Sequence, residues 1–265
     1  GTSATEFEDD DGNTGHSPSA VGNTSANTTV KKFGASSAEF DGSGDYLSVP
    51  DHADWRLGDS GTGNLTIDMW IYLDSLAKKG WINQLEGVEP IDDWYFEFHS
   101  SIGPRFVVND AGSELINFAQ GDITGWSTGT WYHVAVIRGW NGNANDWAIT
   151  RDGAVVASVT DSLTIPDFAA ALEIGTSRNG DFQGKQDEVR ISNTARWTTD
   201  FSASLPSSEY TSDSNTKLLM HMNEKAATSD TTHDTTLISN TTVAESQPDQ
   251  ANIVMLVENS TTTPT

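Results

Sequence analysis

The sequence predicts an all-β fold, a jelly-roll sandwich of two antiparallel sheets with an irregular C-terminal extension. Short runs that alternate apolar and polar residues recur along the chain, and Gly, Asn and Asp residues that form turns separate them. No long window carries the apolar spacing of a helix. Many short strands without helices are typical of a sandwich rather than of an α/β fold.

The strands follow from this alternation in chain order. From Leu65 to Leu73 the odd-numbered residues are all apolar and share one face, while Trp70 and Tyr72 share the other. The run Trp131–Arg138 is apolar on both faces, which is typical of a central strand. Further strands are expected over four shorter runs, namely Trp94–Phe98, Arg105–Val108, Leu115–Phe118 and Glu188–Ile191.

Two further elements and one turn complete the pattern. The run Trp147–Ala157 is predicted to be a hairpin, because its central Asp152-Gly153 dipeptide suits the positive φ angles of a tight primed turn. Lys217–Met222 is expected to be one more strand. Lys78 and Lys79 are expected to lie in a turn between strands.

The composition also predicts a boundary near the C-terminus. Residues 1–224 are predicted to form one domain, with residues 216–223 as a strand that returns to it. Residues 225–265 are predicted to be a linker or extended arm, because Thr, Ser and Asp dominate its first part and leave little to bury. The apolar run at residues 252–258 is strand-like and is expected to pair with this domain, a neighbouring copy or a downstream domain, since unpaired strands aggregate.

The charge of the chain narrows the classes of partner. Its 38 acidic and 14 basic residues give a formal net charge of -24. Such an excess repels nucleic acid and anionic membrane surfaces and favours hard divalent cations. The absence of cysteine excludes disulfides, thiolate zinc sites and cysteine nucleophiles. No apolar run is long enough to predict membrane insertion.

Three segments share their order and spacing with a known family. They are Phe33–Pro50 with Leu65–Trp70, Trp131–Arg138 with the hairpin at Arg151–Gly153, and Gly180–Asn193 with Ala195–Trp197. Through them the chain resembles, over residues 7–222, the laminin G-like branch of the concanavalin A-like lectin and glucanase superfamily. This resemblance implies a jelly roll of two antiparallel sheets.

The beginning of the family pattern is displaced in this chain. Glu6–Asn13 resembles the loop that follows the first strand of the family, but no Leu-Leu-His run precedes it. Leu218–Met222 looks like that strand. Either the C-terminus returns to fill the slot or a second repeat begins there. We expect the return, because an unfilled slot would expose the edge of a sheet.

Catalysis is not expected. Hydrolases of the superfamily carry paired glutamates on one strand, and glycoside hydrolysis needs two carboxylates facing each other across the scissile bond. The candidate strands hold Asp68 with Thr66, Glu97 alone, and Asp187 with Glu188. Alternation would place Asp187 and Glu188 on opposite faces. We therefore predict that the chain is not an enzyme.

Calcium is the expected cofactor, in a structural role. The loop Asp9–Asn13 offers several oxygen ligands around a glycine, as a hard cation requires. The resemblance implies an ion that joins this loop to the Asp-Glu-Val strand, with Asp9 and Asp187 as ligands and backbone carbonyls completing the shell. The alternative is that both carboxylates are simply solvated.

Exposed aromatic residues beside polar ones predict a sugar site, because a pyranose stacks its C–H face on the ring while its hydroxyls form hydrogen bonds. The loop at residues 140–146 combines one tryptophan with three asparagines. The predicted ligand-binding residues are Trp140, Asn141, Asn143, Asn145, Trp94 and Trp126. The alternative is that these tryptophans fill the core.

These features predict a non-catalytic carbohydrate-recognition or adhesion module of an extracellular or virion surface protein. Its expected partner is a glycan or a host-surface polysaccharide. Ser246–Thr265 is similar to linking regions in large structural proteins of marine tailed phages, which favours a virion appendage. The alternative is a purely structural or decoration protein whose C-terminal arm mediates assembly with other subunits.

Overall fold

The structure, a computed structural model, describes residues 7–10, 12, 15–57, 63–87 and 91–224. The contacts of the chain separate it into two units, Gly1–Ala226 and Ala227–Thr265. All described residues belong to the first unit. The expected arm at residues 225–265, including the strand-like run at 252–258, lies outside the described residues.

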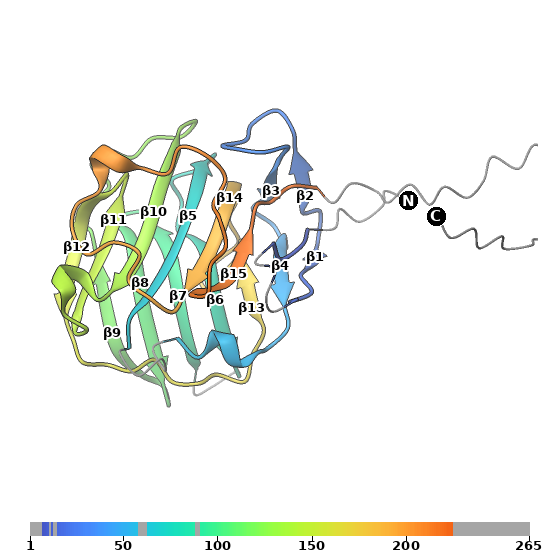
Figure 1. The fold of residues 1–265 in the computed structure, drawn as a ribbon. Coiled ribbons are helices and arrows are strands. Elements are labelled where there is room, and N and C mark those ends of the chain that lie inside the picture. Colours follow the sequence, from blue (N-terminus) through green and yellow to red (C-terminus); the bar gives the residue numbers. More distant parts are fainter. Residues whose placement is uncertain (1–6, 11, 13–14, 58–62, 88–90, 225–265) are drawn as a thin grey trace, which may run out of the picture. The chain divides into compact units, whose positions relative to one another are not determined.

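Two antiparallel sheets lie face to face (Figure 1). One has seven strands, in the order β1 (Ser19–Val21), β4 (Tyr46–Val49), β13 (Leu172–Ile174), β6 (Lys79–Glu86), β7 (Asp92–His99), β8 (Gly103–Asp110) and β9 (Ser113–Ala119). The other has eight, in the order β12 (Ala154–Thr160), β11 (Asp146–Arg151), β10 (Trp131–Arg138), β5 (Leu65–Leu73), β14 (Gln183–Ser192), β3 (Ser37–Asp41) and β2 (Ser25–Asn27), with β15 (Thr216–Met220) beside β14. Helical structure within the described ranges consists of three short 3-10 turns, η1 (Ala53–Trp55), η2 (Trp140–Gly142) and η3 (Ser202–Ser204). The predicted all-β sandwich is confirmed.

The core lies between the two sheets and follows the predicted alternation. The odd-numbered residues of β5 all belong to it, and β5 and β10 have the expected bounds. β10 is a central strand, because it pairs with β5 on one side and with β11 on the other. The largest side chains sealed inside include Trp55, Trp81, Trp94 and Trp147.

A second layer covers the outer face of the eight-stranded sheet and explains why β10 is apolar on both faces. Ala135 and Ile137 point outward and pack with Ala148, Trp140 and Phe201. The segment at residues 193–215, orange in Figure 1, crosses the front of this sheet and supplies part of the cover. The chain thus has apolar layers on both sides of the eight-stranded sheet.

The hairpin between β11 and β12 forms as predicted. Asp152 and Gly153 both have positive φ angles, 49° and 78°, as a primed turn requires. A side chain at Gly153 would also collide with the backbone of Ser202. The turn therefore needs glycine twice over, for its backbone angle and for the close approach of the covering segment.

β6 is a strand that the alternation did not reveal. Lys79, expected in a turn, is its first residue. The pairing of β6 with β7 shifts register between Gly80 and Ile82, and such a bulge interrupts the two-residue period that identifies a strand. The expectation for Lys79 is therefore corrected.

β15 lies between β14 and the N-terminal segment. Leu219 pairs with Arg190 of β14. On its other side, the amide of Asp10 donates to the carbonyl of Leu219 at 2.6 Å, and the amide of His221 donates to the Asp10 carboxylate at 3.0 Å. Within the described residues, β15 thus has neighbours along both edges.

Candidate functional site

The loop between β10 and β11 owes its shape to two residues with positive φ angles. Gly139 has a φ of 105° and Asn141 a φ of 56°. A Cβ atom at position 139 would lie 2.8 Å from the Asn64 side chain, so glycine permits the close approach. The resulting turn, η2, directs the Trp140 ring onto Phe201 and its apolar neighbours, and Trp140 is 6% exposed.

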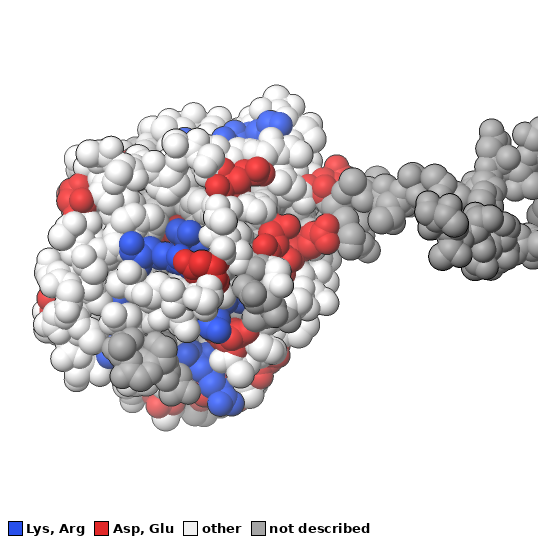
Figure 2. Space-filling model, viewed as in Figure 1, with Lys and Arg blue, Asp and Glu red and all other residues white. Residues whose placement is uncertain are grey.

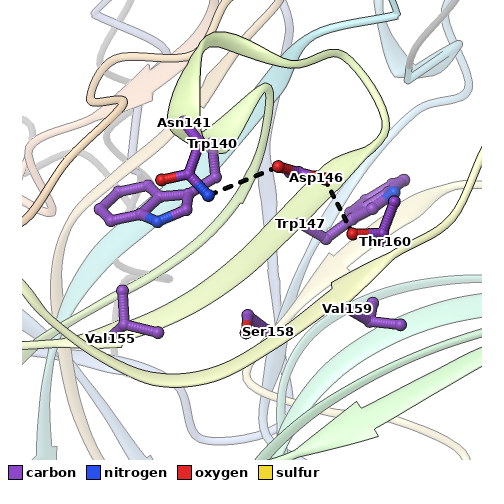
Figure 3. Close-up of a pocket in the computed structure, with 8 residues that line it drawn as sticks. All are labelled: Trp140, Asn141, Asp146, Trp147, Val155, Ser158, Val159 and Thr160. Atoms are coloured by element: carbon purple, nitrogen blue, oxygen red, sulfur yellow. Dashed lines mark hydrogen bonds between the residues drawn. The ribbon is translucent and has the colours of Figure 1, made fainter.

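This loop borders a hollow of about 270 Å³ at the edge of the eight-stranded sheet (Figure 3). Its other walls come from β11 and β12. The lining residues are Trp140, Asn141, Asp146, Trp147, Val155, Ser158, Val159 and Thr160. Val155 is one of the two large hydrophobic residues exposed in the described part of the chain, at 40%. The hollow therefore combines indole and aliphatic surface with a rim of polar groups.

Asp146 organises the polar rim. One of its carboxylate oxygens accepts the Thr160 hydroxyl at 2.8 Å, and the other faces the Asn141 amide at 3.4 Å (Figure 3). The Asn143 amide reaches Asp146 at 3.4 Å, and its oxygen accepts the backbone amide of Asn145 at 3.1 Å. Asn143 and Asn145 thus shape the loop, and neither lines the hollow.

The other two candidate tryptophans lie elsewhere. Trp94 is 0% exposed in the core, and its Nε1 donates to Gln84 at 3.1 Å. Trp126 is buried against Tyr132, with its Nε1 bonded to Gln120 at 2.8 Å. Both residues belong to the core between the sheets, and neither lines the hollow, so the expectation that Trp94 and Trp126 bind a ligand is corrected. They pack the core.

The predicted metal ligands occupy different surroundings. Asp9 accepts the backbone amide of Leu219 at 3.2 Å. Asp187 is fully buried; its Oδ2 accepts the amides of Lys32 at 2.7 Å and Phe33 at 3.1 Å. Its Oδ1 forms no hydrogen bond within the described residues. The donor chemistry of that oxygen fits calcium, which takes carboxylate oxygens.

Burial controls the ionisation of Asp187. Desolvation raises the pKa of this carboxyl to about 7, although the amides of Phe33 and Lys32 oppose the rise. The neighbouring Glu188 carboxylate adds to it. Without a cation, Asp187 is therefore largely protonated below neutral pH.

A bulge in β14 corrects the expected arrangement of Asp187 and Glu188. Glu188 has a φ of 53°, and the pairing with β5 shifts register between Asp187 and Arg190. Asp187 pairs with Trp70, and Glu188 accepts the amide of Tyr210 at 2.7 Å; both partners belong to the outer apolar cluster. Both carboxylates therefore lie outside the core, on the same face, each bonded to backbone amides.

The same outer face holds a buried polar network that the sequence did not predict. Arg190 donates to both oxygens of the fully buried Asp68, at 3.0 and 2.9 Å. His133 Nε2 lies 3.0 Å from the Tyr210 hydroxyl and 3.5 Å from Asp68. The Arg190 guanidinium stacks over the Tyr210 ring. On the surface above this network, Figure 2 shows further basic and acidic side chains next to each other.

The seven-stranded sheet carries a separate polar cluster on its side away from the core. Arg105 Nε donates to the buried Glu97 at 3.0 Å, and Asn179 donates to the other oxygen of that carboxylate at 2.9 Å. The Arg105 guanidinium also lies over the Tyr95 ring. Glu97 is thus part of an ion pair on this sheet. The sequence signal for its outward direction was its position between the core residues Phe96 and Phe98.

A comparison with family models identifies the fold. A laminin G-type model, described as the concanavalin A-like lectin/glucanases superfamily, matches residues 41–200. The chain belongs to this superfamily. The similarity of Ser246–Thr265 to phage proteins is not tested by this match and stays a prediction.

Several solved structures resemble this laminin G-like domain. The binding domain of Paraclostridial Mosquitocidal Protein 1 has a TM-score of 0.56 at 11% identity, covering 76% of this chain and 50% of that chain. Domain 4 of AbnA, a GH43 extracellular arabinanase from Geobacillus stearothermophilus solved with arabinotriose, has a TM-score of 0.52 at 14% identity, covering 76% and 97%. Trypanosoma rangeli sialidase, solved with the inhibitor DANA, has a TM-score of 0.51 at 12% identity, covering 76% and 31%. The laminin G-like chain spans half of the toxin domain, and these similarities show the fold alone.

The chain has no match among curated proteins. Within the described residues, no helix is long and apolar enough to cross a membrane.

Proposed function

We propose that this laminin G-like domain is a non-catalytic carbohydrate-binding module and that the hollow beside Trp140 is its binding site. One observation carries the proposal: a tryptophan ring borders the same space as an amide, a carboxylate and two hydroxyls, from Trp140, Asn141, Asp146, Ser158 and Thr160. Sugars need this combination of an apolar surface and fixed polar groups. Pockets for drug-sized ligands begin at about 300 Å³, so a hollow of about 270 Å³ suits a small saccharide.

The structural relatives support a binding role. The arabinanase domain, of which 97% is covered, was solved with arabinotriose, and the toxin relative is a binding domain. Both belong to larger proteins by their descriptions. We infer that this domain likewise serves a larger protein by holding it on a polysaccharide.

The chemistry of the hollow favours binding over hydrolysis. Asp146 is its single carboxylate, and it is engaged by the Thr160 hydroxyl. Hydrolysis of a glycosidic bond needs a second carboxylate on the other side of the bond. The hollow therefore suits recognition of a sugar rather than its cleavage.

We also propose that the domain is displayed outside the cell or on a virion surface and that it binds a structural calcium ion. Display outside the cell or on a virion surface agrees with the net charge of -24, which keeps an exposed surface hydrated. A structural calcium ion would use Asp187, whose Oδ1 lacks a hydrogen bond within the described residues, and Asp9. Calcium would balance the negative charge of the buried Asp187 carboxylate, whose hydrogen bonds come from backbone amides.

The binding site can be tested with two substitutions. Trp140→Ala removes the indole that borders the hollow and is expected to weaken saccharide binding about tenfold or more. Asn141→Gly keeps the backbone, because glycine accepts a φ of 56°, and removes one amide. Losing a single hydrogen bond is expected to weaken binding by about 2- to 10-fold. Isothermal titration with arabinotriose and with the saccharides selected on a glycan array measures both effects.

A tryptophan at the other end of β10 provides the control. Trp131 packs on Tyr72 and does not line the hollow, so Trp131→Ala should leave binding unchanged. Thermal melting separates a loss of fold from a loss of binding in Trp140→Ala. Equal affinities of Asn141→Gly, folded Trp140→Ala and the unaltered chain would reject the hollow as the site, and an array without any bound saccharide would reject the function.

A further inference from the structure

Two histidines and an aspartate converge beside η1, far along the chain from the hollow at Trp140. His52 Nδ1 lies 3.0 Å from Asp54 Oδ2, and His16 Nε2 lies 3.4 Å from the same oxygen. The three ligand atoms all lie within 4.8 Å of one another. His16 comes from the N-terminal segment, whereas His52 and Asp54 flank the start of η1, so the fold brings together residues that the sequence separates.

The hydrogen-bond pattern leaves two acceptor atoms of this cluster facing each other, although Lys217 pairs with the other oxygen of Asp54. The amide of Asp54 donates to His52 Nδ1 at 3.2 Å, so that nitrogen presents a lone pair. The same nitrogen lies 3.0 Å from Asp54 Oδ2, which is also a lone-pair acceptor. Two acceptors at this distance repel each other unless a cation or a proton lies between them.

A second observation points to a ligand at the same place. The His16 side chain is 4% exposed, and its Nε2 forms no hydrogen bond within the described residues; the same holds for Asp54 Oδ2. Buried polar atoms are nearly always hydrogen-bonded, because an unpaired one costs stability. The Trp55 ring packs against His16 at 4.4 Å between centroids and holds the imidazole in this position.

The spacing of the donors matches a coordination shell. Transition metals bind imidazole nitrogen and carboxylate oxygen at about 2.1 Å. Two ligand atoms on such an ion are separated by about 3.0 Å at a right angle and about 3.4 Å at the tetrahedral angle. Asp54 Oδ2 lies 3.0 Å from His52 Nδ1 and 3.4 Å from His16 Nε2, which correspond to these two separations.

The cluster also opens to one side. A shallow hollow of about 230 Å³ lies against it, lined by Gly15, His16, Ser17, Pro50, Asp51 and His52. A metal ion held by three protein ligands keeps further positions for water or for a ligand. The hollow offers room for those groups.

We propose that His16, His52 and Asp54 form a binding site for a divalent transition-metal ion, of the zinc, cobalt or nickel class, with open positions facing the adjacent hollow. Imidazole ligands select these ions over calcium and magnesium, which prefer oxygen. The site is separate from the calcium expectation at Asp9 and Asp187 and does not depend on carbohydrate binding. The acidic surface, with a net charge of -24, favours the approach of a cation.

Titration of the untagged full chain with zinc chloride tests the site. One zinc ion per chain is expected, and cobalt chloride should give the visible absorption of a cobalt ion bound by nitrogen ligands. His52→Ala and Asp54→Asn should each weaken zinc binding by at least about tenfold, a loss that even outer-shell changes can cause. The His52 side chain is 47% exposed, so His52→Ala should fold normally.

Two further variants make the test specific. Lys217 Nζ lies 3.3 Å from Asp54 Oδ1, and Lys217→Gln should tighten zinc binding because it removes a competing positive charge. His99→Ala is the matched control, since His99 lies on β7 and bonds to the amide of Ser101; it should bind zinc as the unaltered chain does.

Three results would overturn the proposal. The first is an absence of zinc binding by the folded chain. The second is binding that neither His52→Ala nor Asp54→Asn changes. The third is binding that is lost only in Glu209→Gln, because Glu209 belongs with Glu188 and His221 to a second group of potential ligands and zinc would then lie there.

Discussion

Replacement of Arg190 by methionine is expected to lower the free energy of unfolding by about 3–5 kcal/mol, the cost of leaving a buried charge without its partner. Asp68 is fully buried and receives two hydrogen bonds from Arg190. Burial alone would raise the pKa of the Asp68 carboxyl, but Arg190 and His133 hold it below its ordinary value. Urea denaturation at pH 7, followed by tryptophan fluorescence, measures the loss.

The partly exposed ion pair of Arg196 and Asp213 serves as the control. Arg196 bonds to Asp213 at 2.6 and 2.9 Å, but the Asp213 side chain is 46% exposed. Solvent screens such a pair, which contributes at most about 1 kcal/mol. Arg196→Met also removes hydrogen bonds to Ser192 and Thr216, but it leaves no buried charge without a partner, so its cost should stay below that of Arg190→Met. The double variant Asp68→Leu with Arg190→Met should recover part of the loss, because apolar residues can replace a buried pair. A cost for Arg190→Met no greater than that for Arg196→Met would contradict the prediction.

The Asp68–Arg190 pair connects the sheet to its cover and, through the cover, to the hollow. Tyr210 and Trp197 of the covering segment lie over the Arg190 guanidinium. Phe201 stacks on Trp197 and belongs to the apolar cluster that contains Trp140. The position of the Trp140 ring therefore depends on contacts made across the outer face of the eight-stranded sheet. A stable cover is a condition for the proposed sugar site.

Regular strands could be predicted from the sequence because an unbroken two-residue period reports directly on the two faces of a sheet. β5 has this period throughout its expected bounds, whereas β10 was identified as an apolar run on both faces, typical of a central strand. A β-bulge interrupts this two-residue period, so a strand with a bulge cannot be assigned from the period alone. One in β6 hid that strand, and one in β14 moved Glu188 to the face of Asp187. Residues 193–215 could not be assigned as a cover, since they lack any period from which a face is read.

The candidate site was predictable only in part. The loop that holds Trp140 and Asn141 was identified by composition. The wall supplied by Val155, Ser158 and Thr160 was not, because those residues reach the hollow through the β11–β12 pairing. Trp94 was assignable to the core, because Trp94, Phe96 and Phe98 occupy every second position of one strand and therefore share its apolar face.

The convergence of His16 with His52 and Asp54 could not be predicted from the sequence either, because it too depends on tertiary contacts. No metal-binding spacing links residues that lie so far apart along the chain. Their approach results from contacts of the N-terminal segment with the region around η1, including the His16–Trp55 packing. Local patterns report on faces and turns, and sites assembled from distant segments require the tertiary structure.

Asp187→Asn is expected to stabilise the domain at pH 8 and to leave its stability nearly unchanged close to pH 4. The pKa of Asp187 is about 7 in the folded chain and about 3.9 when unfolded. Between these values the folded state holds a proton that the unfolded state has lost, so stability falls as pH rises through this window. A difference of about three pH units corresponds to on the order of 4 kcal/mol. Asparagine removes the charge and keeps an oxygen for the amides of Lys32 and Phe33.

Urea denaturation of both proteins from pH 4.5 to pH 8, in the presence of EGTA, measures the difference. Asp213→Asn is the control of opposite sign. Hydrogen bonds from Arg196 lower the pKa of Asp213, so its ionised form stabilises the fold and the substitution should destabilise it at neutral pH. If Asp187→Asn gains nothing over the unaltered chain above pH 7, the burial of an unbalanced Asp187 charge is not a source of instability.

The same measurements separate the Asp187 charge from the proposed calcium ion. A calcium ion on Asp187 Oδ1 would stabilise the carboxylate and thereby the folded state, since a ligand that binds only the folded chain raises its stability. Calcium chloride in place of EGTA should therefore raise the melting temperature of the unaltered chain at pH 8 and flatten its pH dependence. Asp187→Asn should lose most of this response, because an amide oxygen is a weaker calcium ligand than a carboxylate. Identical melting curves of the unaltered chain in calcium and in EGTA would reject the ion while leaving the pH prediction intact, because the desolvation of Asp187 acts without any metal.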